Sequence, residues 1–487
     1  MALLPLDIPP GFLKTDSPNA GKGRFTDGDR VHFPGGKAEK WPGWEMFLDD
    51  AVLGAARGAT AWSNADGNTN AAIGTHLKLY SITGDDTLTD RTPIRASGTL
   101  GNDPFAVVLG STTVTVTDTA HAADLDDFVT YAGATAGGGI TIVGEYQITE
   151  IIDADHYTIE HSTPATSTDS TTGGAAVTYA YQINVGSGSG VVGLGWGAGP
   201  WGSGTWSTPR ATGIPTELRH WSLSEYGNEL LASPSLGSLY LWEEGSDDRA
   251  ELVSGAPASM RAMFVTPERF IMALGTSTPM TVQWPDQDDL TDWTPSAANT
   301  ANTRTLQSGS KLMGGTGVAD GISLVWSDTA LYLFQYTGSE FIYDSRLVGR
   351  HCGLLAPKAF AATASGLVCW ISGHSFHSSS GGAPELIPSQ DDVRDFVFAD
   401  MDPDQTGKTW AQYIEDGNLV RWHYVSVDSS NGEPDSYVDV MLGGSYPWTT
   451  GTFDATTGTA YRPTDTLALF VNSSGEIHRF GIGVDAD

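Results

Sequence analysis

Short hairpin-like segments recur along the chain at a nearly constant interval. Each segment combines an apolar run, a turn rich in Gly, Ser, Asn or Asp, and a second run that ends in aromatic residues. The seven segments are 71–82, 229–242, 270–284, 323–336, 366–377, 418–427 and 467–480. Markers in the last six segments follow one another at steps of 44, 50, 42, 48 and 54 residues; they are Tyr240, Trp284, Phe334, Phe376, Tyr424 and His478.

This interval matches one blade of a β-propeller, in which four short strands take about 40–50 residues. A single blade cannot bury both of its faces, so blades pack around an axis and the ring must close. Closure also removes the free sheet edges that would otherwise aggregate. The sequence therefore predicts an all-β protein, a β-propeller of six or seven blades. A string of β-sandwich domains is the alternative, and the regular interval favours the propeller over it.

One step in the series is too long for a single blade, because 160 residues separate Tyr80 from Tyr240. Within this step, segment 111–161 alternates strongly between apolar and polar residues and carries its own turns. We therefore expect a small all-β domain inserted in a blade loop, where the two chain ends already lie close together. The expected boundaries are 55–103 for the first blade region, 104–187 for the inserted domain and 188–487 for the remaining blades.

Two further segments are irregular. Residues 1–54 hold too many prolines and glycines for a long regular element, so we expect an extended N-terminal arm that wraps the body or a neighbouring subunit. Segment 186–206 is glycine-rich and contains Trp196, Trp201 and Trp206. These three tryptophans predict a loop that is held against a surface or a subunit interface.

The charge of the chain excludes some classes of function. A net charge of -33 repels nucleic acid and anionic lipid, and no basic face marks a specific DNA or RNA reader. The acidic surface suits simple solubility, a salty habitat, or a surface past which DNA slides. The N-terminus lacks the basic region of a signal peptide and no apolar run would span a bilayer, so we expect synthesis in the cytoplasm.

No motif predicts a catalytic residue, a cofactor or a metal. Asp400, Asp402 and Asp404 have calcium-ligand spacing, but Gln405 and Ala411 stand where an EF-hand loop needs Gly and Glu. The acidic cluster 286–292 is interpreted in the same way, as a solvated turn. The sequence holds no GxSxG, HExxH or CxxC motif, although any of its 58 acidic residues could form the carboxylate pair of a glycosidase.

Two other groups of reactive side chains receive structural interpretations. His374 and His377 would point to opposite faces of a strand, with His351 near them in sequence, so a shared metal is not expected. Cys352 and Cys369 are expected to be buried free thiols, with a disulfide as the alternative.

The arm carries a more specific pattern, IPPGF at 8–12 followed by GRFTDGDRVHFPGGKAEKWPGW at 23–44. It resembles the start of the tail nozzle proteins of short-tailed phages, also called stabilisation or hub proteins, which show GRW-x-D…VRF…G…K-x-GGW. Phe25, His32 and Pro42 depart from that pattern. The residues assigned to the family motif and to assembly are Gly23, Arg24, Phe25, Asp27, Arg30, Val31, Phe33, Gly36, Lys40, Gly43 and Trp44.

The resemblance implies a structural virion protein and not an enzyme. Its members form a ring, usually a hexamer, below the portal and adaptor rings, where the ring closes the DNA exit channel and attaches fibres. The implied location is the virion tail, and genomic DNA would pass through the lumen without specific binding. The alternatives are a propeller that binds or cleaves a polysaccharide, and a host-binding tail tip.

Overall fold

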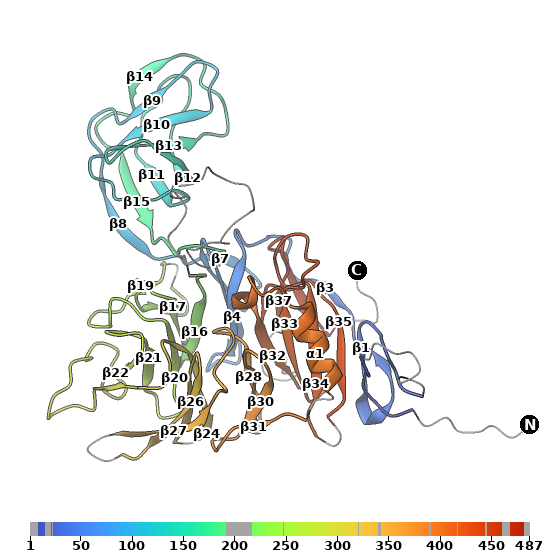
Figure 1. Cartoon of the computed structure of the whole chain (residues 1–487). Helices are drawn as coiled ribbons and strands as arrows, with labels where there is room; N and C mark the ends of the chain where they lie inside the picture. The colour runs from blue at the N-terminus through green and yellow to red at the C-terminus, as the bar shows by residue number, and fades with distance from the viewer. Residues whose placement is uncertain are drawn as a thin grey trace, which may run out of the picture. The chain divides into compact units, whose positions relative to one another are not determined.

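The computed structural model describes residues 8–14, 21, 23–190, 217–246, 248–319, 321–338, 342–388, 391–415, 417–443, 446–459 and 468–481. Seven four-stranded sheets follow one another along the chain, and we number them blades 1 to 7 (Figure 1). The first strands of neighbouring blades contact one another, and the first strand of blade 7 contacts that of blade 1. The chain is therefore a closed seven-bladed β-propeller, which confirms the predicted fold class.

In every blade the strand order within the sheet follows the chain. Blade 1 contains β4 (Ala56–Ser63), β5 (Thr69–Thr75), β6 (Leu79–Ile82) and β7 (Leu88–Asp90). Blade 2 contains β16 (Trp221–Tyr226), β17 (Glu229–Pro234), β18 (Tyr240–Trp242) and β19 (Glu251–Leu252). Blade 3 contains β20 (Ala262–Val265), β21 (Ile271–Leu274), β22 (Thr281–Trp284) and β23 (Asn302–Thr305).

Blades 4 to 6 continue the pattern. Blade 4 contains β24 (Leu312–Ala319), β25 (Ile322–Ser327), β26 (Ala330–Tyr336) and β27 (Tyr343–Arg350). Blade 5 contains β28 (Phe360–Ala362), β29 (Val368–Ile371), β30 (Phe376–Ser379) and β31 (Glu385–Leu386). Blade 6 contains β32 (Trp410–Ile414), β33 (Leu419–Tyr424), β34 (Ser436–Met441) and β35 (Trp448–Thr452).

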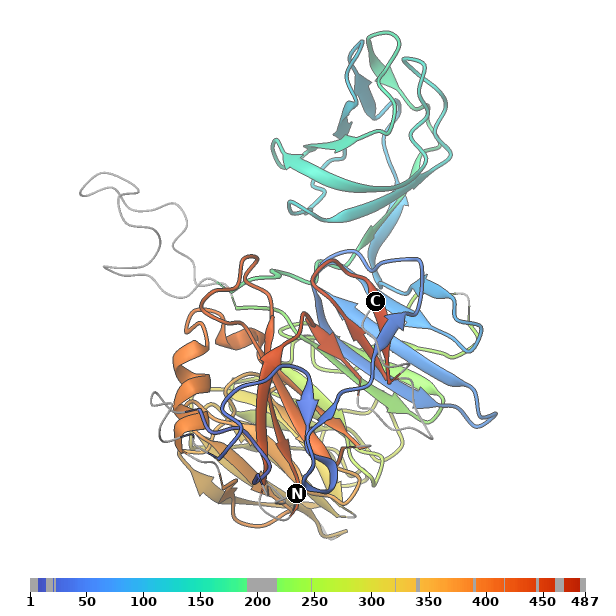
Figure 2. The same cartoon turned by 90° about the vertical axis from the view of Figure 1, so that its right-hand side faces the viewer.

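Blade 7 joins the two ends of the chain. Its first three strands are β36 (Thr457–Gly458), β37 (Leu469–Val471) and β38 (Ile477–Phe480), and its outermost strand is β3 (Trp44–Met46). The register pairs Trp44 with Phe480 and Glu45 with Arg479 (Figure 2). A ring closed in this way leaves no unpaired strand at the joint between first and last blade.

Six of the seven expected hairpins are the two middle strands of a blade, which is why their interval equals the blade length. The segment 418–427 differs, because it holds only strand β33, and the chain reaches the partner strand β34 at Ser436. The prediction of a hairpin at 418–427 was wrong: the long loop between these strands carries no tight-turn signal. The count of blades is unaffected, since β33 and β34 still pair.

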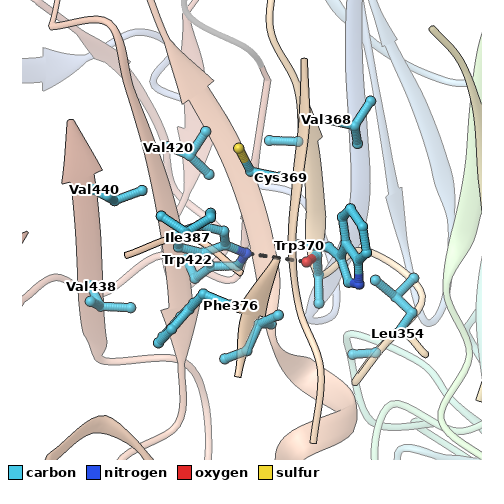
Figure 3. Close-up of a cluster of buried hydrophobic side chains, with 14 of the residues drawn as sticks. Leu354, Val368, Cys369, Trp370, Phe376, Ile387, Val420, Trp422, Val438 and Val440 are labelled. Carbon is cyan, nitrogen blue, oxygen red and sulfur yellow. Dashed lines mark hydrogen bonds between the residues drawn. The ribbon is translucent and has the colours of Figure 1, made fainter. Parts of the chain in front are cut away.

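The cores lie between the faces of adjacent blades. Strands β21, β29 and β33 are buried along their whole length because blades cover both of their faces. Between blades 5 and 6, Trp370, Phe376 and Trp422 pack with aliphatic residues, and the Trp422 Nε1 donates to the Ala359 carbonyl at 3.2 Å (Figure 3). Buried indoles need such partners, and these bonds fix the distance between blades.

Two glycines allow one of these indoles to enter the joint of blades 1 and 2. Trp221 donates from Nε1 to the Thr75 carbonyl at 2.7 Å. A Cβ on Gly74 would lie 2.2 Å from the Trp221 Cγ, and a Cβ on Gly58 would lie 2.7 Å from the Trp221 carbonyl oxygen. Close packing of blade 2 on blade 1 therefore requires glycine at both positions.

Helical structure is scarce among the described residues. It comprises the α-helix α1 (Asp391–Asp400) and the short 3-10 turns η1 (Pro34–Gly36) and η2 (Thr406–Lys408). Helix α1 precedes blade 6, and neither it nor any other described helix has the length and apolarity that a bilayer crossing requires.

The N-terminal arm, residues 8–54 in its described part, packs on its own propeller. It contains the two-stranded sheet of β1 (Val31–His32) and β2 (Glu39–Lys40) before it reaches β3. Its contacts with blade 6 are hydrogen bonds from Phe12 N to Trp448 O at 2.7 Å, from Arg30 N to Tyr437 Oη at 3.1 Å and from Thr452 N to Asp29 Oδ1 at 2.8 Å.

A second compact unit comprises Asp90–Gly186 together with Ser246–Glu251. It contains an eight-stranded sheet in the order β14-β9-β10-β13-β12-β11-β15-β8. The strands are β8 (Ile94–Thr99), β9 (Phe105–Val107), β10 (Thr113–Thr117), β11 (Phe128–Ala132), β12 (Gly144–Ile151), β13 (His156–Glu160), β14 (Asp169–Thr172) and β15 (Thr178–Gln182). The sequence boundary of 104 omits β8, a strand of small and polar residues that pairs with β15.

The core of this unit contains a chain of tyrosines. Tyr131 and Tyr157 are hydrogen-bonded through their hydroxyls, Tyr157 and Tyr181 share a bond of 2.7 Å, and Tyr181 donates to Asp118 at 2.6 Å. Burial is the main cause that raises the pKa of Tyr157 to about 12. The hydroxyls therefore stay protonated and satisfy one another inside an otherwise apolar core.

Candidate functional site at the mouth of the ring axis

A cavity of about 540 Å³ opens where the first strands of the blades begin. The first strands lie innermost, since they contact one another between neighbouring blades, so this cavity lies at one mouth of the ring axis. Blades 2 to 6 contribute residues at or just before those strands, among them His220, Arg261, Lys311, Pro357 and Lys408. Apolar walls come from Leu218, Leu312, Met313, Leu354 and Leu355.

A cation stands near the start of the first strand in six of the seven blades. Each occupies the first two residues of that strand or the two residues before it. In blade order they are Arg57, Arg219, Arg261, Lys311, Lys358 and Lys408. The chain has only 25 Lys and Arg residues among 487, so six at equivalent positions of the repeat concentrate positive charge at one mouth.

Four of these cations share two carboxylates. Glu217 accepts from Arg261 at 2.7 Å and from Lys311 at 3.2 Å. Burial alone would raise the pKa of Glu217, but these two cations more than offset it, and the pKa lies below its ordinary value.

Glu433 is shared in the same way at the other side of the mouth. It accepts from Arg57 at 2.7 Å and from Lys408 at 3.1 Å, and all three side chains are largely buried. Burial raises and the two cations lower the pKa of Glu433, with a net decrease. This triad ties blade 1 to blade 6, so it contributes to the stability of the ring as well as to its charge.

The remaining two cations have no carboxylate in contact. Arg219 donates to the Ser235 carbonyl at 2.8 Å, and its Nε is buried without a hydrogen-bond partner. Lys358 forms no side-chain hydrogen bond or ion pair with the described residues, and burial lowers its pKa to about 8. Burial of an uncompensated ammonium is unfavourable, so the fold tolerates a cost at Lys358.

His220 reports the local potential. Its pKa is lowered to about 3, first by burial and then by the positive charges of Arg57 and Lys358. The imidazole is therefore neutral at physiological pH and is not poised to exchange protons. The arrangement suits recognition of negative charge and not acid–base chemistry, since the mouth holds no hydroxyl or thiol activated by a neighbouring base.

The residues of the family motif gather elsewhere, at blades 6 and 7. Phe33 is buried against Phe12 and Phe25, with ring centroids 5.9 and 5.2 Å apart. The Arg30 guanidinium lies 4.8 Å from the centroid of the Trp44 ring. Gly23 and Gly36 have φ values of 79° and 81°, while Asp27 pairs with Lys14 and Arg24 donates to the Gly21 carbonyl.

Trp44 packs edge-on against Phe453 at 4.9 Å and Phe470 at 6.0 Å, in the direction of blade 7. Gly43 accepts from Gly481 N at 3.0 Å. The motif therefore surrounds the strand that closes the ring. Trp196, Trp201 and Trp206 lie outside the described residues.

The other candidates of the sequence analysis do not converge. Asp402 accepts from Asp404 N within a turn, whereas Asp400 accepts from the Tyr424 hydroxyl at 2.9 Å. Within 286–292, the Asp286 and Asp289 side chains bond to Thr300 and Thr291 of the same loop region. Among the described residues, no three His, Cys, Asp or Glu side chains meet with the geometry of a metal site.

The histidines and cysteines have separate surroundings. His377 stacks on Trp370 and bonds to the Ser372 hydroxyl, whereas His351 is exposed. Cys352 and Cys369 are buried free thiols, as predicted, and burial raises their pKa values to about 11 and about 12.

No protein-family model matches the chain, and no curated protein matches its sequence. Among solved structures it is similar to an endosialidase of phage phi92, at 10% identity and a TM-score of 0.26, over 93% of this chain and 72% of that chain. YCF48 bound to D1 peptide has 10% identity and a TM-score of 0.32, over 80% and 100%. A mitotic checkpoint complex has 10% identity and a TM-score of 0.35, over 82% and 97%. Scores this low say nothing about the function of this chain.

Proposed function

We propose that this propeller is a structural virion protein, the tail nozzle or hub of a short-tailed phage. The observation that carries the proposal is that the motif residues of the arm, from Phe25 to Trp44, surround the closing strand β3 instead of lining a pocket. Residues so placed would be retained for architecture. A scaffold protein of this kind needs a closed, stable ring more than it needs reactive groups.

In this proposal several copies, six by resemblance to the family, form a ring below the portal and adaptor and carry the fibres. The net charge of -33 supports the role, because a negatively charged lumen between copies would give phosphates no attractive contacts. The axis of a single propeller, with its basic mouth, is a separate feature from that lumen. The proposal assigns no catalysis and no cofactor to the chain.

Native mass spectrometry of the full chain, alone and with a portal–adaptor complex, tests the proposal. Ring-sized oligomers that add below the adaptor would support it. A chain that stays monomeric with the adaptor present, and that shortens an acidic polysaccharide in a size-exclusion assay, would replace it with the polysaccharide hypothesis.

The inserted unit provides a second arm of the test. Replacing residues 91–186 with a short Gly-Ser linker removes the whole eight-stranded sheet, including β8. Under the nozzle proposal, particles carrying this deletion assemble tails and retain DNA. Normal tails that fail only in adsorption to the host would instead assign the insert to host binding.

A further inference from the structure

The basic mouth, which we define as Arg57, Arg219, Arg261, Lys311, Lys358 and Lys408, exceeds what the fold needs. Glu217 and Glu433 account for four of these cations as ties between neighbouring blades. Arg219 and Lys358 take no part in such ties. A structural explanation would place a carboxylate next to Lys358, and the described residues provide none.

The charge balance of the mouth differs from that of the chain. Five carboxylates lie close to the six cations, namely Glu217, Asp328, Asp402, Asp404 and Glu433. In the whole chain 58 acidic residues face 25 basic ones, so acids outnumber bases by more than two to one. The mouth is thus a local positive site on a strongly negative protein, and it selects for an anionic partner.

The shape of the cavity narrows the class of partner. Its volume of about 540 Å³ is that of a site for a small ligand or a few amino-acid residues. A nucleic-acid duplex is too wide to enter it. Five leucine and methionine side chains and Pro357 form its walls, so the ligand must present apolar groups between its charges.

We propose that the basic mouth binds an acidic peptide segment of a partner protein, with Glu or Asp side chains alternating with apolar ones. The carboxylates would contact Lys358, Lys311 and Arg219, and the apolar side chains would lie against Leu312, Met313 and Leu354. Each unpaired cation would then gain the counter-charge that the isolated chain does not supply. This inference is independent of the proposed function, because it requires only the single propeller.

Titration calorimetry of the full chain with the peptide Glu-Leu-Glu-Leu-Glu, blocked at both ends, tests the inference. We expect binding that weakens as salt is raised, and no binding of the matched Gln-Leu-Gln-Leu-Gln peptide. Lys358→Gln should weaken binding about tenfold, as expected for one charge-assisted hydrogen bond. Arg304→Gln, which changes an exposed cation on β23, should leave binding unchanged.

Stability separates recognition from a structural role. Lys358→Gln removes a buried, uncompensated charge, so its melting temperature should equal or exceed that of the wild type. A marked decrease would assign Lys358 to the fold and overturn the inference. Lys311→Gln, at a half-exposed position, provides a second variant that should also weaken binding.

Two binding results would also overturn the inference. One is equal affinity for the Glu and Gln peptides. The other is tighter binding of inorganic phosphate or of a hexathymidylate than of the acidic peptide, which would assign the mouth to phosphate groups.

Discussion

Arg421 and Asp439 face each other across β33 and β34 through two hydrogen bonds of 2.8 Å, and 2% and 1% of their side chains are exposed. The guanidinium also lies 4.8 Å from the Trp41 ring of the N-terminal arm and 4.0 Å from that of Tyr437. Burial is the largest cause that raises the pKa of Asp439, which shows how much the carboxylate depends on its cation. This pair links blade 6 to the arm.

Removing one member of this pair should be more harmful than removing both. Arg421→Met leaves Asp439 buried without a counter-charge, so we expect a loss of about 3–5 kcal/mol in unfolding free energy. The double variant Arg421→Met/Asp439→Leu should recover most of that loss. Denaturation in guanidinium chloride measures both, and a double variant as unstable as the single one would show that the ring contacts of Arg421 dominate.

The joint between blades 1 and 2 should not accept a methyl group. In Gly74→Ala the new Cβ meets the Trp221 ring, so the indole must move away from the Thr75 carbonyl. We expect a loss of about 1–3 kcal/mol from overpacking, read as a lower melting temperature. Gly382→Ala is the matched control, because a Cβ there meets nothing within 4 Å. Equal melting temperatures for the two variants would contradict the packing argument.

The closing strand should not accept proline. Glu45 lies in β3 opposite Arg479, and Glu45→Pro removes a backbone donor from that ladder. We expect the arm to detach and become sensitive to a protease at concentrations that leave the wild type intact. Glu45→Gln keeps the backbone donor at an exposed position and should behave as the wild type does. Resistance of the proline variant would mean that the arm is held without the strand.

Acidification should destabilise the fold through its buried histidines. Burial lowers the pKa of His377 to about 4 and that of His220 to about 3, whereas an unfolded histidine titrates near 6.5. Below pH 6.5 the unfolded chain therefore binds more protons, and stability falls as the pH decreases toward these folded values. Each histidine contributes at most about 1.4 kcal/mol per pH unit.

Melting temperatures of the wild type and of His377→Gln between pH 7 and pH 4.5 isolate one such contribution. The variant should lose less stability than the wild type over this range. Parallel curves would show that His377 is protonated in the folded protein.

The sequence predicted the blades because their signal is local. Alternating apolar residues and a tight turn occur within about 14 residues, and seven such segments were found without knowledge of the ring. Strand β8 and the segment 418–427 were misjudged where that local signal fails: β8 is exposed along its length, and β33 meets its partner only after a long loop. Helix α1 has too few apolar positions to stand out.

The basic mouth was not predicted, because its members are far apart in the chain and look like ordinary surface residues one at a time. A signal did exist. Aligning the chain by blade places Arg261, Lys311 and Lys358 at equivalent positions, but that alignment requires the start of each first strand. Assignment of the motif residues had the opposite difficulty, since their pattern was visible while their role in closing the ring depends on residues more than 400 positions away.

Strand β3 has a consequence for how the protein is made. The ribosome synthesises residues 44–46 near the beginning, whereas their partner β38 ends at Phe480. During nearly the whole of translation the nascent chain therefore carries an open sheet edge that only its final residues can cover. A transcript cut short before that point yields blades without closure, so a cell's proteases would remove incomplete copies before they could join an assembly.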